Sequence, residues 1–170
     1  MEAGVLWTRW SARIAIAFYV ASLAVRRRSP RWSRVSWTAG CLAYLLHVAC
    51  AFEYYHYWSH ATAYEATARQ TADVIGLNWG GGLYLNYVFT LVWFVDVLWW
   101  WTSMQSYLAR PRPIEWAVQG FLGFIAFNGT VVFAAGFGRW LGIAACGLLG
   151  VVLIRQWSWD RGGPARQSDE

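Results

Sequence analysis

The chain has 170 residues, of which 58% are hydrophobic and only 14% are charged, well below the roughly 25% charged residues of an ordinary soluble domain. This composition excludes a disordered chain. A net charge of +5 would suggest a polyanion binder on a soluble scaffold, but the 19% aromatic residues, including 14 tryptophans, point to a lipid bilayer instead. All 14 basic residues are arginine, so a protein that needs a lysine Schiff base, such as a retinal pigment, is excluded too.

Five apolar stretches set the predicted fold. A helix that spans a membrane needs about 20 mostly apolar residues. Stretches of this kind run approximately from 5 to 25, 35 to 58, 83 to 103, 114 to 135 and 140 to 157. We therefore predict an all-α integral membrane protein in which residues 1–160 form a single bundle of five transmembrane helices. The polar residues 161–170 are predicted to be a disordered tail.

The distribution of arginines predicts the orientation of this bundle, because cytoplasmic loops keep an excess of positive charge. Ten arginines fall on one side of the predicted helices: Arg26, Arg27, Arg28, Arg31, Arg34, Arg110, Arg112, Arg155, Arg161 and Arg166. Four fall on the other side or near it: Arg9, Arg13, Arg69 and Arg139. The expected topology in the cell membrane therefore has the N-terminus outside and the C-terminus in the cytoplasm.

The loop after the second predicted span has the composition of a helix. Residues 60–75 are rich in alanine, lack proline and glycine, and place Glu65 four residues before Arg69, a spacing that stabilises helices. Gly76 is a suitable residue to end such a helix. We expect an additional helical segment on the outer face, between the second and third transmembrane helices.

All three histidines lie in or just after the second predicted span. On a continuous helix with about 100° between residues, Glu53, His56 and His60 would share one stripe. One carboxylate and two imidazoles suit zinc, iron, copper or manganese. Further ligands would come from water, a second copy of the chain, or one of Tyr57, Tyr64, Glu65, Asn78 and Asn86. The sequence therefore predicts a metal site near the outer face.

An ion pair offers an alternative explanation for the same residues. Counted along the helices, Arg9 and Glu53 lie at nearly the same depth on neighbouring antiparallel spans. Pairing between them would explain both charges without a metal. His56 and His60 would then be interfacial aromatic residues, bonded to water or backbone.

Two ionisable groups lie deeper in the predicted spans, where such groups are costly unless they are paired, protonated or hydrated. His47 is near the middle of the second span, and Asp96 lies toward the cytoplasmic end of the third. They could line a polar track for protons or ions with Asn86, Asn128, Gln119 and Arg13. Alternatively, Asp96 pairs with an arginine of the inner side, and His47 bonds to a facing helix.

Three functions are consistent with these features. The first is a small membrane protein that binds a metal or metal-containing cofactor, as a subunit of a redox or transport assembly. The second is a non-catalytic accessory or scaffold subunit that makes helix-packing and lipid or pigment contacts. The third is a proton or ion transporter that uses His47 and Asp96. The expected partners are the lipid bilayer and other membrane subunits or further copies of this chain, with no nucleic acid.

Overall fold

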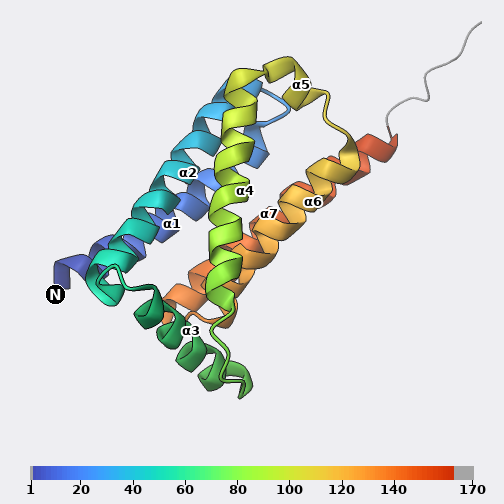
Figure 1. Cartoon of the computed structure of the whole chain (residues 1–170). Coiled ribbons are helices and arrows are strands. Elements are labelled where there is room, and N and C mark those ends of the chain that lie inside the picture. The colour runs from blue at the N-terminus through green and yellow to red at the C-terminus, as the bar shows by residue number, and fades with distance from the viewer. Residues whose placement is uncertain (1, 163–170) are drawn as a thin grey trace, which may run out of the picture.

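The computed structural model describes residues 2–162, except for the side chains at positions 2, 156, 157 and 159–162. Within this range every element is helical and no strand occurs (Figure 1). The elements in chain order are α1 (Glu2–Val25), α2 (Pro30–Ala51), η1 (Phe52–His56), α3 (His60–Ile75), α4 (Gly82–Thr102), α5 (Met104–Leu108), α6 (Arg112–Phe127), η2 (Asn128–Val132) and α7 (Phe137–Gly162). The η elements are single π-helical segments that continue α2 and α6.

Three helices are long and apolar enough to cross a membrane. They are Pro30–His56, which joins α2 to η1, Gly82–Thr102, which is α4, and Phe137–Arg155 in α7. The other two predicted spans correspond to α1, which carries Arg9 and Arg13, and to α6, which is 16 residues long before η2 extends it. The predicted tail lies outside the described residues from position 163 onward, whereas positions 161 and 162 belong to α7.

Local sequence signals account for the helix ends around α3. The hydroxyl of Ser59 accepts a hydrogen bond from the backbone N–H of Thr62 at 3.3 Å and caps the start of the helix. Gly76 ends the helix with a left-handed φ of 74°, which costs glycine little. Glu65 and Arg69 form an exposed pair at 3.8 Å on this helix. The helix predicted at residues 60–75 is confirmed.

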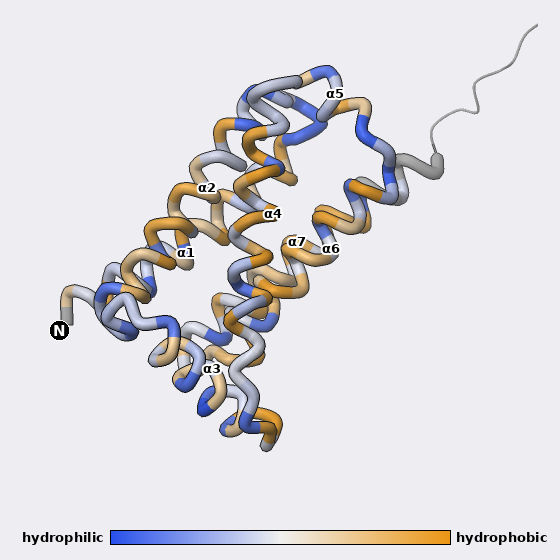
Figure 2. Tube along the Cα trace, viewed as in Figure 1, coloured by the Kyte–Doolittle hydropathy of each residue, from blue (hydrophilic) through white to orange (hydrophobic). Residues whose placement is uncertain are grey.

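The long helices form two antiparallel pairs, which contact each other through α1 and α7, and α4 packs against α2 of one pair and α6 of the other. In Figure 1, α1 runs alongside α2 on one side of α4, and α6 runs alongside α7 on the other. The short helix α5 lies at one end of the molecule, and α3 lies across the opposite end. Figure 2 shows hydrophobic positions along the long helices and hydrophilic positions gathered near α5 and α3.

Aromatic side chains fill the junction of α1, α2 and α4. The rings of Tyr19, Trp37 and Trp93 each lie within 5.7 Å of the other two, measured between centroids, and all three residues are buried. Gly40 allows this approach, because a Cβ atom there would lie 3.0 Å from the Trp93 ring. This core holds α2 against α4 at the level of Asp96.

The second helix pair is held by a close backbone contact. A Cβ atom added to Gly142 in α7 would overlap the carbonyl oxygen of Thr130 in η2. A residue without a side chain is therefore required at this position, as is common where membrane helices pack closely.

Candidate functional site

Asp96 is the centre of a buried polar cluster near the end of the molecule that carries α5. It lies on α4, and only 4% of its surface is exposed. Its Oδ2 atom accepts a hydrogen bond from Trp37 Nε1 at 2.9 Å and another from the Tyr107 hydroxyl at 2.8 Å. Its Oδ1 atom accepts one from Arg110 Nη1 at 2.6 Å. Such charge-assisted bonds are what a buried carboxylate requires.

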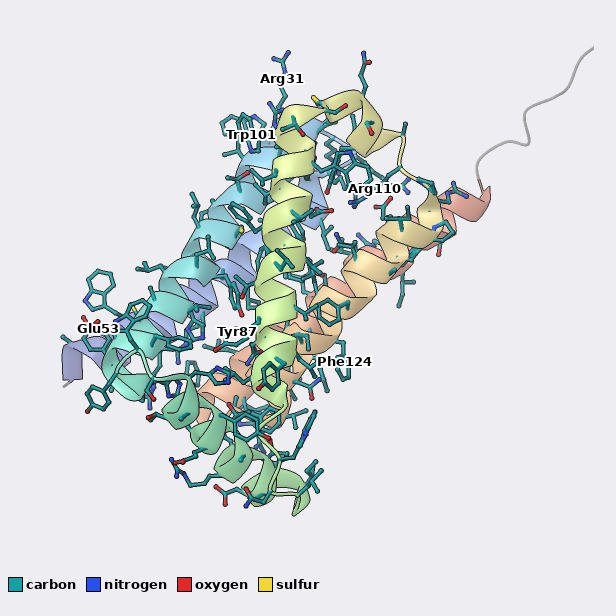
Figure 3. The ribbon with its side chains drawn as sticks, in the orientation of Figure 1. Arg31, Glu53, Tyr87, Trp101, Arg110 and Phe124 are labelled. Atoms are coloured by element: carbon teal, nitrogen blue, oxygen red, sulfur yellow. The ribbon has the colours of Figure 1, made fainter. Side chains whose placement is uncertain are left out.

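Arg110 reaches this carboxylate because α5 turns the chain back after α4 ends at Thr102. In Figure 3 its side chain points inward from the connection between α5 and α6. The guanidinium carbon lies 4.2 Å from the centroid of the Tyr107 ring, a cation–π contact. Nε and Nη2 of Arg110 are also buried, yet they have no hydrogen-bond partner in the described part of the chain.

Tyr107 links the ion pair to the aromatic core. Its ring stacks on Trp100 with 4.3 Å between centroids and an interplanar angle of 12°. Burial, followed by the negative charge of Asp96, raises the pKa of Tyr107 well above its ordinary value. Tyr107 therefore stays neutral and keeps the proton that it donates to Asp96.

A cavity of about 350 Å³ lies beside this cluster. Four arginines and one glutamate line it, together with a buried glutamine and three apolar side chains: Arg26, Arg27, Arg110, Arg112, Glu115, Gln119, Leu108, Trp116 and Leu153. Arg26 forms an ion pair with Glu115 across the junction of α1 and α6. The Gln119 side chain accepts a hydrogen bond from the Tyr19 hydroxyl at 3.0 Å.

The structure does not bring Glu53, His56 and His60 together into one group of ligands. Glu53 and His56 lie in η1, and Tyr57 and Trp58 then adopt left-handed backbone angles with φ of 50° and 56°. His60 consequently begins a different helix, α3, instead of continuing the stripe of Glu53 and His56. Across the described residues, no group of three histidine, cysteine, aspartate or glutamate side chains could hold a metal.

Each predicted ligand has its own surroundings. The Glu53 carboxylate accepts a hydrogen bond from Trp58 Nε1 at 2.7 Å. His60 Nδ1 lies 3.1 Å from the Tyr87 hydroxyl, and His60 Nε2 lies 3.4 Å from the Tyr84 hydroxyl, both on α4. Nδ1 of His56 is buried without a hydrogen-bond partner in the residues that the structure describes.

The alternative ion pair between Glu53 and Arg9 does not form either. The ion pairs among described side chains are Arg26–Glu115, Arg69–Glu65 and Arg110–Asp96, and Arg9 is exposed. The π-helical turn and the change of direction after it give Glu53 a partner five residues along the chain instead of one on α1.

The remaining predicted polar residues are not joined into one track. His47 Nδ1 donates a hydrogen bond to the carbonyl oxygen of Thr8 on α1 at 2.9 Å. Asn128 Nδ2 donates to the Phe124 carbonyl oxygen of its own helix at 2.8 Å. Asn86 is exposed, and the half-buried Arg13 lies 5.1 Å from the Trp10 ring.

Sequence reasoning singled out Asp96 but missed Trp37, Tyr107 and the specific role of Arg110. The one available signal was the free-energy cost of burying Asp96 in the membrane near the cytoplasmic arginines. This cost favoured an arginine partner but did not identify which arginine. Comparison with known protein families, curated proteins and solved structures finds no match.

Proposed function

We propose that this chain is a multi-pass protein of the cell membrane with five crossing helices. The proposal is supported by the helix pairs, because α1 lies alongside α2 and the α6–η2 segment lies alongside α7. If α2 and α7 cross the bilayer, their antiparallel partners occupy the same depth. Arg9 and Arg13 would then lie toward one interface, where long side chains can extend into the headgroup region.

The proposed orientation has the end with α5 in the cytoplasm. The turn between α1 and α2 and the connection between α5 and α6 meet at this end, and both are rich in arginine. At the opposite end, α3 carries Arg69, and Arg139 lies in the first turn of α7. The excess of positive charge near α5 favours the cytoplasmic side, with the N-terminus outside and the C-terminus inside.

Within the membrane, we propose that the protein is a scaffold or accessory subunit without chemistry of its own. The observation that carries this proposal is that the deep polar groups are used in helix packing. His47 bonds α2 to α1, Asp96 bonds α4 to Trp37 and Arg110, and Gln119 bonds α6 to Tyr19 of α1. Groups engaged in this way favour a structural role over a proton path or a metal centre.

The outward face of α4 supports contact with lipid or with partner helices. Val88, Leu91, Val95 and Leu98 recur at a spacing of three or four residues, and between 46% and 61% of each is exposed. A continuous apolar stripe of this kind needs lipid tails or another apolar helix against it. Other membrane subunits or further copies of this chain are the proposed partners.

Labelling of single cysteines with a membrane-impermeant maleimide tests the first four crossings and their orientation. In a cysteine-free background, Ala3→Cys, Gln70→Cys and Ala135→Cys should react in intact cells. Arg28→Cys and Gln105→Cys should react only after permeabilisation. If Ala3→Cys and Arg28→Cys react from the same side, α1 does not cross; if Gln105→Cys and Ala135→Cys do, α6 does not cross.

Metal content and the visible spectrum of the protein in mild detergent test whether it holds a metal or a coloured cofactor. A scaffold should be colourless and hold no stoichiometric metal, and in liposomes it should conduct no proton or ion flux. A stoichiometric metal that is lost in both Glu53→Ala and His60→Ala would overturn the proposal. A flux abolished by Asp96→Asn in folded protein would do the same.

A further inference from the structure

The cavity beside Arg110 has the composition of an anion-binding site. We propose that it binds a phosphate group, carried either by a lipid headgroup or by a free phosphate ion. The inference goes beyond the proposed scaffold role and does not depend on the number of crossings. It rests on three independent features: an incompletely bonded buried guanidinium, the charge of the lining, and the start of a long helix.

Arg110 provides the first feature. Its side chain has no exposed surface, and Asp96 uses only its Nη1 atom. Nε and Nη2 are left without a partner among the described residues, and unsatisfied buried donors of a charged group are costly. Because Arg110 lines the cavity, an oxygen-rich anion bound there would lie next to a guanidinium with two unpartnered nitrogens.

The lining charge provides the second feature. Arginine guanidinium groups bind phosphate oxygens in pairs of parallel hydrogen bonds, so clustered arginines favour phosphate over a simple halide. Four arginines line the cavity, and Glu115 is the acidic residue among the side chains that line it. Glu115 already pairs with Arg26, so a bound phosphate would compete with this carboxylate for the same guanidinium.

The third feature is the start of α6. Arg112, Glu115, Trp116 and Gln119 all lie on the first two turns of this 16-residue helix and line the cavity. The N-terminal end of a helix carries partial positive charge, which favours anions. Pro113 has no N–H group and the N–H groups of Ile114 and Glu115 donate to the Pro111 carbonyl oxygen, so this end contributes through its dipole and its side chains. Leu108, Trp116 and Leu153 add an apolar wall that could accommodate the glycerol and upper acyl carbons of a phospholipid.

Thermal unfolding of the full chain in detergent, with native mass spectrometry, tests the site. Sodium phosphate is compared with sodium chloride at equal ionic strength, and maltoside micelles containing phosphatidylglycerol are compared with maltoside micelles containing diacylglycerol, which has no phosphate. A higher unfolding midpoint with phosphate alone identifies a free anion. A higher midpoint with phosphatidylglycerol alone identifies a lipid headgroup. If neither ligand raises the midpoint, the proposal is overturned.

Matched arginine variants separate a defined site from general attraction to positive charge. Arg112→Gln should weaken the affinity for the active ligand by about tenfold, the value of one charge-assisted hydrogen bond. Arg31 lies at the same end of the molecule, and its exposed side chain points away from the bundle (Figure 3). Arg31→Gln should leave the affinity unchanged. Equal losses in the two variants would overturn the proposal.

Glu115→Gln provides a test that misfolding cannot imitate. This variant removes the carboxylate that competes for Arg26 and should tighten ligand binding by about fivefold, as expected for release of one partly exposed ion pair. An unchanged or weaker affinity would overturn the assignment of Arg26 to the site.

Discussion

The Oδ1 atom of Asp96 lies 2.6 Å from the Nη1 atom of Arg110, and almost no surface of either side chain is exposed. The two residues are 14 positions apart, on α4 and on the connection that follows α5. Removing two charges from water is costly, and only a good geometry with additional hydrogen bonds offsets that cost. Here Trp37 and Tyr107 supply these bonds to the carboxylate.

Alanine variants of this pair should destabilise the protein strongly. Asp96→Ala and Arg110→Ala each leave one buried charge without its partner, at a cost of about 3–5 kcal/mol. The double variant should cost less than the two single variants together, because it leaves no lone charge. The measurement is a double-mutant cycle on the free energy of unfolding in detergent.

The exposed Glu65–Arg69 pair on α3 is the control for this cycle. Both side chains are about 70% exposed, so their alanine variants should show a coupling of only about 0.5 kcal/mol. A coupling at Asp96 and Arg110 as small as the one on α3 would contradict the buried pair.

Two buried tryptophans differ in one hydrogen bond and therefore form a matched pair. Trp37 Nε1 donates to Asp96, whereas Trp93 Nε1 is buried without a partner in the described residues. Trp37→Phe should lower the free energy of unfolding by about 1.5–3 kcal/mol more than Trp93→Phe, the range for a bond to a charged group. Equal losses would show that ring volume alone decides the effect.

Two glycines of α7 should differ in how well they tolerate an added side chain. Gly142→Ala places a methyl group against the Thr130 carbonyl oxygen, which should force α7 away from η2 and cost about 1–3 kcal/mol. A Cβ atom at Gly150 meets nothing within 4 Å, so Gly150→Ala should change stability by less than about 0.5 kcal/mol. Thermal unfolding in one detergent provides the comparison, and a tolerated Gly142→Ala would contradict the close approach of these segments.

Tyr107 predicts a loss of stability at alkaline pH. Its pKa is raised in the folded protein, so the fold favours the neutral phenol. This contribution is fully present below the unfolded pKa of about 10 and decreases as the pH rises above it toward the folded value. Tyr107→Phe removes this titration. Its unfolding free energy should therefore fall less steeply above about pH 10 than that of the wild type. Parallel slopes in the two proteins would contradict the prediction.

Several features of the fold follow from local residue patterns. The helix at residues 60–75 depends on alanine-rich composition, the Ser59 cap and the left-handed glycine at position 76, all of which act over a few residues. The apolar stretches that became α2, α4 and α7 are equally local signals. Such features can be predicted because each depends on neighbours in the chain and not on distant contacts.

The metal stripe shows where such local reasoning ends. Alignment of Glu53, His56 and His60 required an unbroken α-helix, and nothing in the local pattern excludes left-handed angles at Tyr57 and Trp58. A tyrosine or tryptophan in that conformation is unfavourable by itself. Tertiary contacts on both sides of this turn accompany the left-handed conformation. Before the turn, Gly4 in α1 packs against the Tyr54 ring, and after it His60 contacts Tyr84 and Tyr87.

By itself, the sequence determined the helical class, the apolar segments and the uneven distribution of arginines, since composition and short-range periodicity are sufficient for these. Only the tertiary structure decided that Arg110, rather than another arginine, binds Asp96, and that Trp37 and Tyr107 complete the cluster. The rotation of each helix about its axis and the turn made by α5 set these contacts. Both depend on packing among side chains far apart in the chain, which no local pattern encodes.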